Sequence, residues 1–141
     1  VTLPPDDNGS LRNIPVWKDP LAFMVGNDHP LAQKKQIPLQ ALADYPAILP
    51  SMSTFTRRIV EGMFQEHNLR IDVPISTNYL ETIKMMASIG LGWTVLPATM
   101  LDEDIKPLQV EGVALSRSLG VVYHPGHSLS NAAKAILDLL N

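Results

Sequence analysis

Four short runs of apolar residues along the chain have the length of buried strands. They cover residues 21–26, 47–49, 92–96 and 119–123. Turn formers such as Pro, Gly or Asp flank these runs, as is typical of strands covered on both faces in a parallel sheet. Two weaker strands are predicted: residues 70–76, where polar and apolar side chains alternate, and residues 108–113, which include a glycine as bulge or turn. Residues 100–106 are predicted to be a polar, acidic connection.

Apolar residues recur at helical spacing in the segments between these strands. A short helix is predicted within residues 37–44, with Leu39 and Leu42 facing the core. A second helix is predicted over residues 54–67. Its expected buried stripe consists of Phe55, Ile59, Val60, Met63 and Phe64. Asn68 follows and can end this helix in the left-handed conformation.

The third predicted helix begins in the polar turn at residues 76–78. Asn78 is a good N-cap, and Glu81 three residues later completes the pattern of a capping box. The apolar face of this helix consists of Leu80, Ile83 and Ala87. Gly90 stands where a left-handed residue is needed after the last turn, so the helix ends there and the strand at 92–96 follows.

A fourth helix is predicted near the end of the chain, capped by Ser128 or Ser130. Its apolar face consists of Ala133, Ile136, Leu137 and Leu140. Residues 1–16 are rich in Pro, Asp, Asn, Gly and Ser, which predicts a connector with only a short strand at its start. The alternation of strands and helices favours an α/β fold, with an open parallel or mixed sheet flanked by helices.

Composition narrows the class of protein. The 141 residues are enough for one ordinary domain or two small lobes, and 45% hydrophobic with 18% charged residues is typical of a folded globular protein. A net charge of -3, with 11 basic residues mostly scattered along the chain, argues against direct nucleic-acid binding. The absence of cysteine excludes disulfides, thiolate zinc sites and cysteine nucleophiles.

The sequence also lacks the marks of membrane insertion and export. No apolar run reaches the roughly 18 residues that a membrane helix needs, and no charged start precedes an apolar export segment. No membrane partner is therefore expected. Because the chain begins with Val1 rather than Met, we expect it to be a fragment of a longer protein.

Motifs for catalysis, cofactors and metals are missing. Gly90 and Gly92 follow a helix instead of joining a strand to a helix, so they form no phosphate-binding loop. His124 and His127 flank one turn and can share a metal ion, but no third ligand stands near them in the sequence. No serine lies in a nucleophile elbow, and the acidic run at residues 102–104 is expected to be a solvated loop. We expect no enzyme, no cofactor and no metal.

Two hydroxyl-rich turns carry the functional signal that remains. They comprise residues 51–56 and 76–78, and each lies between a strand end and a helix start. Free amides, the positive end of a helix dipole and short hydroxyl side chains together suit a small anion or a metabolite carboxylate. The alternative is that these residues only cap their helices. Arg57 and Arg58 are similarly ambiguous: one can reach an anion, or both are solvated or paired across a subunit contact.

Four segments, in this order and approximate spacing, resemble the effector-binding domain of LysR-type transcriptional regulators. They read LAFMVGNDHPLA, LQALADYPAILPS, STFTRRIVEGMF and ETIKMMASIGLGWTVLP. The turn at residues 28–32 and the glycine pair followed by Leu96 and Pro97 are the most specific pieces. The resemblance extends over residues 1–141.

The resemblance implies a two-lobed fold similar to type 2 periplasmic binding proteins, with two strands crossing between the lobes. Residues 1–17 would be a connector from the missing part of lobe 1, and residues 18–117 the effector-binding lobe 2. Residues 118–141 would form a crossing strand and a C-terminal helix that returns toward lobe 1. The helix-turn-helix, the linker helix and most of lobe 1 would lie outside the chain.

The resemblance also implies a binding site. In the family, the turn after the strand like 47–49 contributes effector ligands, and Thr56 matches a threonine that binds anions in some members. The implied effector-binding residues are Ser51, Ser53, Thr54, Thr56, Thr77 and Asn78. Arg57 departs from the pattern, because a small residue often follows that threonine in the family.

The implied function is that of a cytoplasmic sensor for a bacterial transcription regulator. A small, anionic effector would favour closure of the cleft and, through a regulatory-domain homodimer or tetramer, change the spacing of the DNA-binding heads. DNA would be bound only by the missing helix-turn-helix. In the family the helix like 54–67 packs against a second subunit, so Arg57, Arg58 and Glu61 would be exposed for that contact. The alternative is a solute-binding protein of a transport system, which an upstream export signal would identify.

Overall fold

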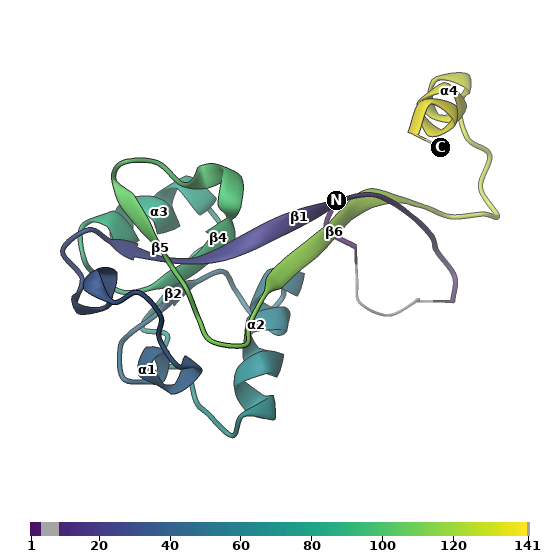
Figure 1. Ribbon diagram of the computed structural model, residues 1–141. Helices are drawn as coiled ribbons and strands as arrows, with labels where there is room; N and C mark the ends of the chain where they lie inside the picture. The colour runs from purple at the N-terminus through teal and green to yellow at the C-terminus, as the bar shows by residue number, and fades with distance from the viewer. Residues whose placement is uncertain (4–8, 141) are drawn as a thin grey trace. The chain divides into compact units, whose positions relative to one another are not determined.

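The 15-residue strand β1 (Arg12–Gly26) takes part in both units of the molecule (Figure 1). The computed structural model describes residues 1–3 and 9–140. The larger unit is Pro20–Leu115, and the smaller unit combines Val1–Asp19 with Ser116–Asn141. Residues 12–17, predicted as connector, belong to β1, while residues 4–8 of that connector and Asn141 lie outside the described residues.

An antiparallel ladder of three strands forms the centre of the larger unit. β4 (Thr94–Pro97) pairs with β1 on one side, and β5 (Ile105–Leu108) pairs with it on the other. Phe23 of β1 lies opposite Val95 in one ladder and opposite Leu108 in the other. Because one strand pairs on both sides, β1 fixes the register of the whole ladder.

A second, parallel ladder extends the larger unit beyond β4. It consists of β2 (Ile48–Leu49) and β3 (Ile75–Ser76), with Leu49 opposite Ser76. A parallel bridge between Ala47 and Trp93 connects this ladder to the start of β4. The sheet is therefore open and mixed, which confirms the predicted fold class.

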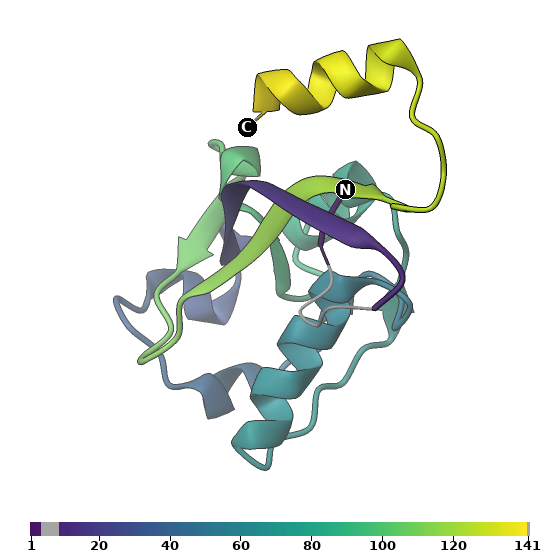
Figure 2. The ribbon, with the colours of Figure 1, turned by 90° about the vertical axis from the view of Figure 1, so that its right-hand side faces the viewer.

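Helices cover both faces of this sheet (Figure 2). The α-helices of the larger unit are α1 (Leu39–Ala43), α2 (Phe55–Glu66) and α3 (Leu80–Ser88), and its 3-10 turns are η1 (Pro30–Gln33) and η2 (Ala98–Met100). Alternate side chains of β1 enter opposite clusters: Phe23 packs with the residues of α1 and α2, and Met24 packs with those of α3. This alternation follows from the two-residue period of a strand.

Trp93 joins the strands to the helices in the larger cluster. Its side chain is fully buried and stacks on Phe64 of α2, with ring centroids 5.6 Å apart. Its indole N–H donates to the carbonyl oxygen of Leu42 at 2.9 Å. A buried indole needs such an acceptor, so the end of α1 and the start of β4 are held together.

The smaller unit contains β6 (Leu115–Tyr123), which pairs with β1, and α4 (Asn131–Leu140). Arg117 of β6 donates to Asp19 at 2.7 Å, and both side chains are largely buried. Ser130 caps α4 by accepting from the amide of Ala133 at 3.1 Å, so the second of the two predicted serines is the cap. No helix within residues 1–3 and 9–140 has the length and apolar character needed to cross a membrane.

Both predicted left-handed helix ends are confirmed. Asn68 after α2 has φ 56°, and Gly90 after α3 has φ 90°. At α3 the amide of Gly90 donates to Ala87 and the amide of Leu91 donates to Met86, at 3.0 and 3.1 Å. These two bonds define a Schellman ending, which satisfies carbonyls that the helix leaves open.

The prediction that residues 92–96 belong to a parallel sheet holds on one side only, where Trp93 forms a parallel bridge with Ala47. β4 is completely buried, as expected, but it runs antiparallel to β1. Its burial results from the helices on both faces of the sheet, and such burial is independent of strand direction. The apolar pattern therefore predicted the environment of the strand and not its partner.

Two weaker strands were placed incorrectly. Within residues 70–76 only Ile75 and Ser76 form a strand, although the predicted alternation of exposure is present along the segment. The strand predicted at 108–113 lies earlier, at β5, and includes Pro107. Proline is rare within strands because it lacks an amide hydrogen, so the sequence pattern did not indicate β5. This strand lies at the edge of its ladder with β1, where a missing amide is tolerated.

The N-terminal halves of two helices also differ from the prediction. Tyr79, not Asn78, is the N-cap residue of α3, and no side chain caps that helix start. In α2 only Val60 and Phe64 of the five-residue apolar stripe are fully buried. Asn78 is instead engaged by the neighbouring turn.

Candidate functional site

The two hydroxyl-rich turns meet at one edge of the parallel ladder. β2 and β3 run in the same direction, with Leu49 opposite Ser76, so the turns that follow them emerge side by side. The amide of Thr77 donates to the carbonyl of Leu49 at 3.3 Å. The two turns are therefore neighbours in the structure.

A hydrogen bond joins the turns directly. The backbone amide of Ser51 donates to Oδ1 of Asn78 at 2.9 Å, across 27 positions of sequence. This contact is why Asn78 does not cap α3. The side-chain amide nitrogen of Asn78 remains exposed at the junction and can donate to a ligand.

The turn at residues 51–54 is closed by its own hydroxyls. The Oγ atoms of Ser51 and Ser53 are 2.6 Å apart, and Thr54 donates to the carbonyl of Ser51 at 2.8 Å. Thr54 also accepts from the amide of Arg57 at 3.3 Å, which makes it the N-cap of α2. Thr54 therefore shapes the turn, while Ser51 and Ser53 line its exposed side.

Free donors gather in the first turn of α2. Within the described part of the chain, the backbone amides of Phe55 and Thr56 donate to no protein acceptor, and neither does the hydroxyl of the half-buried Thr56. These amides are among those that every helix leaves open at its N-terminus. Together with the helix dipole, they form a positive environment that favours an anion.

The two arginines at this helix start have different roles. Arg57 pairs with Glu61 at 2.8 Å and donates to the carbonyl of Pro50 at 2.9 Å. Its side chain is only 11% exposed, so the expectation that Arg57 is exposed for a subunit contact is wrong. The bond to Pro50 connects α2 to the residue after β2, and the ion pair with Glu61 lies within α2. Both contacts engage the large side chain that follows the threonine.

Arg58 is the exposed cation of the turn. Its Nε donates to the carbonyl of Met52 at 3.3 Å, and its guanidinium lies 5.6 Å from the ring centre of Phe55. These contacts hold a positive charge beside the turn at residues 51–54. The sequence indicated that one of the two arginines can serve an anion, and the geometry favours Arg58.

Tyr79 is a neighbouring residue that the sequence did not single out. Its amide lies 3.4 Å from the hydroxyl of Thr77, to which it donates, and its side chain is 76% exposed. An exposed aromatic ring directly after Asn78 places an apolar surface next to the polar junction. The one sequence feature that could have drawn attention to Tyr79 is its position directly after the turn residue Asn78.

Other polar groups are tied into structural contacts. His29 accepts from the amide of Leu31 at 3.1 Å, and burial lowers the pKa of this histidine. The hydrogen bond with Asp102 raises the pKa of Lys84, and the same bond lowers the pKa of Asp102. Among the described residues, no three His, Asp or Glu side chains are placed to hold a metal ion.

The sequence matches known proteins along its whole length. Residues 1–141 match the family described as LysR substrate binding domain. Over 128 residues the chain is 30% identical to the HTH-type transcriptional activator CmpR of Synechocystis, covering 87% of this chain and 42% of that protein. Over 127 residues it is 32% identical to the RuBisCO operon transcriptional regulator of Acidithiobacillus ferrooxidans, covering 86% and 41%. The chain thus spans about two fifths of these relatives.

Solved structures share the fold. The regulatory domain of Synechocystis CcmR in complex with 2-PG has a TM-score of 0.85 and 30% identity, covering 99% of this chain and 69% of that one. The effector binding domain of QuiR in complex with shikimate has a TM-score of 0.85, covering 96% and 66%, and its 23% identity supports the fold alone. From the match over its full length, the chain belongs to the LysR substrate binding domain family.

Proposed function

We propose that the chain is the ligand-sensing part of a LysR-type transcription regulator, and that it binds a small anionic effector where the two turns meet. The observation that carries this proposal is the bond between Ser51 and Asn78, which brings two helix starts to one place. The proposed ligand-binding residues are those of the two turns: Ser51, Ser53, Thr54, Thr56, Thr77 and Asn78. Thr54 contributes mainly by shaping the turn.

The chemistry of this place suits an anion. The amides of Phe55 and Thr56 and the Thr56 hydroxyl are donors, and Arg58 supplies a nearby positive charge. A hydrogen bond to a charged group contributes about 1.5–3 kcal/mol, and the helix dipole about 0.3–1 kcal/mol more. Three such donors are sufficient for selective binding of a small carboxylate or phosphate.

The relatives support this ligand class. Two proteins of the same fold are described as complexes with 2-PG and with shikimate, and both compounds are small anions. The curated relatives are transcription regulators, which favours a sensor over a transport protein or an enzyme. A cytoplasmic protein that forms a homodimer or tetramer fits this assignment.

The proposed mechanism is a shift between conformations. Residues 18–117 would act as one lobe, and an effector that binds the closed arrangement of two lobes more tightly would increase its population. The regulatory domains would transmit that change to DNA-binding segments outside this chain. The proposed subunit contact is made by α2, without Arg57, whose side chain is only 11% exposed.

Thr56→Ala in the intact regulator tests the site. Removing the hydroxyl and leaving the amides should weaken binding of the effector about tenfold, the effect of about 1.4 kcal/mol. Isothermal titration measures this, with 2-phosphoglycolate and shikimate as the first probes and other small metabolite anions after them. The thermal midpoint should change little, because the Thr56 hydroxyl makes no hydrogen bond to the described protein.

Thr99→Ala is the matched control, because Thr99 is an exposed threonine in η2, outside the two turns and the helices that follow them. It should bind the same anion with the affinity of the unmodified protein. Equal affinities of the Thr56→Ala variant and the unmodified protein would refute the assignment.

A further inference from the structure

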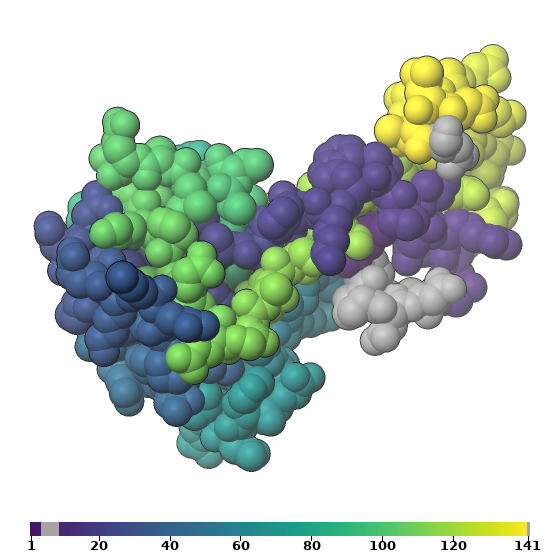
Figure 3. Space-filling view, in the orientation of Figure 1, coloured from purple at the N-terminus to yellow at the C-terminus, as the bar shows by residue number. Residues whose placement is uncertain are grey.

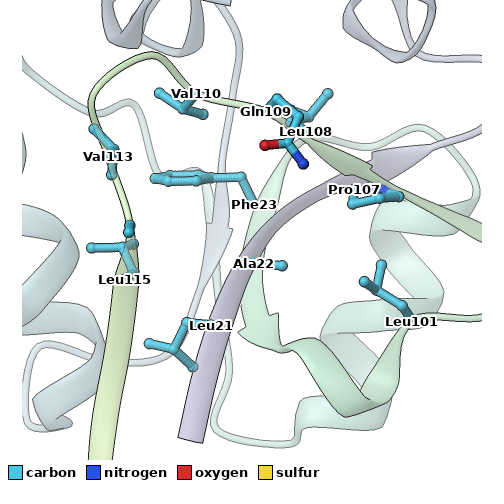
Figure 4. A pocket seen from close by; sticks show the side chains of 11 residues that line it. Leu21, Ala22, Phe23, Leu101, Pro107, Leu108, Gln109, Val110, Val113 and Leu115 are labelled. Atoms are coloured by element: carbon cyan, nitrogen blue, oxygen red, sulfur yellow. The ribbon is translucent and has the colours of Figure 1, made fainter. Parts of the chain in front are cut away.

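A cavity of about 300 Å³ opens at the edge of the sheet in the larger unit, and no residue of the two turns lines it (Figure 4). It lies beside β1, where the chain leaves β5 and before it enters β6. Small-molecule sites in proteins span about 300–1,000 Å³, so this cavity is at the lower end of that range.

Apolar side chains form most of the lining. Figure 4 shows the ring of Phe23 extending between β1 and the loop that carries Val110 and Val113, with Leu21 and Leu115 below it. Among the described residues no charged side chain lines the cavity, and its polar groups are the Gln109 amide and exposed backbone atoms. A carboxylate or phosphate would lose its hydration here without gaining a cationic partner.

The outer wall of the cavity is fixed in place. It is formed by residues 109–115, which lie at the surface beside residues 30–43 (Figure 3). The amide of Ile37 donates to Gln109 and the amide of Glu111 donates back to Ile37, each at 2.9 Å. Gly112 then turns the chain with φ 68°. Because the amide and the carbonyl of Ile37 both bond to the wall, residues 109–115 cannot readily move onto Phe23 and fill the space.

We propose that this cavity is a second binding site, for a small apolar molecule such as an aromatic ring with a short substituent. An apolar cavity of about 150 Å³ is enough to hold benzene, so twice that volume accommodates a substituted ring. The Gln109 amide and the exposed backbone groups can form hydrogen bonds with the substituent of the ring. The cavity and the two turns share no residue, and their proposed ligands differ in class. A negative result at the cavity therefore leaves the proposed anion site untouched, and the reverse also holds.

Occupation of the cavity stabilises the connection between β5 and β6. The ligand contacts Val110 and Val113 on the wall and Phe23 on the floor, and these contacts are lost when the wall opens. The amide of Glu111 reports such opening, because it exchanges with solvent only when its bond to Ile37 is broken. Binding should therefore slow hydrogen exchange at Glu111.

Methyl NMR of the whole chain with toluene tests the proposal. Toluene should shift the methyl signals of Leu21, Val110 and Val113 in a saturable way and slow exchange at Glu111, and contacts between its ring protons and Phe23 should appear as intermolecular NOEs. Benzoate should bind at least tenfold more weakly, because its carboxylate has no cationic partner in the cavity.

Ala114→Phe is the decisive variant, because exposed Ala114 lines the cavity and a ring at this position fills it. It should weaken toluene binding at least tenfold, whereas Ala132→Phe, an equal change at an exposed position of α4, should leave it unchanged. Absence of saturable shifts up to the aqueous solubility of toluene would overturn the proposal. Unchanged toluene shifts in the Ala114→Phe variant would also overturn it. NOEs from toluene to residues away from the cavity would overturn the proposal in the unmodified protein alone.

Discussion

At the start of α2, similar side chains have different tasks. Thr54 and Thr56 are two positions apart, yet Thr54 caps the helix and the Thr56 hydroxyl makes no hydrogen bond to the described protein. Arg57 is held by Glu61 and Pro50, while Arg58 is exposed. Composition alone does not separate these roles, because each depends on where a side chain points after the turn has formed. The free donors, not the number of hydroxyls, determine what the site can bind.

Asn78→Asp separates the structural role of Asn78 from its effect on charge. The aspartate retains an oxygen that accepts from the Ser51 amide, and a negative charge next to two helix starts favours the fold. The thermal midpoint should therefore stay unchanged or rise. Anion binding should fall by about tenfold or more, because like charges repel at this distance.

Isothermal titration and thermal unfolding of the Asn78→Asp variant provide both measurements. Gln65→Glu adds the same charge near the far end of α2 and serves as the control, with unchanged binding. Unaltered anion affinity in Asn78→Asp would show that the ligand does not approach the junction.

His29 should make stability depend on pH. Burial lowers the pKa of His29 in the folded protein below its ordinary value of 6.5, so the unfolded chain takes up the proton first as pH falls. The stabilising contribution of the neutral histidine is complete above pH 6.5 and declines as pH decreases toward the lowered folded pKa. Protonation also competes with the bond from Leu31.

Urea unfolding at pH 7.5 and pH 5.5 measures this dependence for the unmodified protein and for His29→Asn. Asparagine can cap the same turn and does not titrate, so the variant should lose less stability on acidification. The other histidines are common to both proteins and cancel in the comparison. Equal losses in both proteins would exclude His29 as the cause.

At the scale of elements, the segment between α3 and β4 shows why two glycines stand so close together. Gly90 supplies the left-handed residue that ends the helix, with φ 90°. Gly92 has a different role: a Cβ built on it would lie 2.5 Å from the carbonyl oxygen of Pro46. This close approach lets the amide of Trp93 donate to Pro46 at 3.0 Å. The first glycine shapes the turn, and the second allows two backbones to meet.

Gly92→Ala should destabilise the protein by about 1–3 kcal/mol, the range for overpacking of a tight interior. Gly62→Ala is the matched comparison, because Gly62 lies within α2 and a Cβ there meets nothing within 4 Å. That change should stabilise the protein by about 0.5–1 kcal/mol through helix propensity. Chemical denaturation measures both, and a neutral Gly92→Ala would contradict the close approach.

Local signals in the sequence were sufficient for most elements and for the helix ends. Gly90 and Asn68 mark their helix ends because the left-handed conformation is a property of single residues. The antiparallel pairing of β4 with β1 was not predicted, because strand pairing depends on residues far away in the chain. β5 was misplaced since Pro107 hides an edge strand. The adjacency of the two turns was predictable, but the bond from Ser51 to Asn78 was not.

At the scale of the whole molecule, the chain corresponds to one part of the longer architecture of its relatives. It spans about two fifths of the curated regulators it matches, and its larger unit carries both turns of the proposed site. The predicted lobe at residues 18–117 and the larger unit, Pro20–Leu115, differ by two residues at each end. α4 presents Ile136 and Leu139 as exposed apolar side chains, at 56% and 85%. Both turns lie within one unit, so ligand contact at the proposed site can be tested directly on this chain.

The most direct test of anion sensing is an amide NMR titration of the isotope-labelled protein with 2-phosphoglycolate, shikimate and other small metabolite anions. At least one anion should produce saturable shifts, largest at the amides of Phe55 and Thr56 and at the side-chain amide of Asn78. Thr56→Ala should reduce these shifts. Shifts that saturate elsewhere on the protein while these three groups stay unchanged would contradict anion sensing at the two turns.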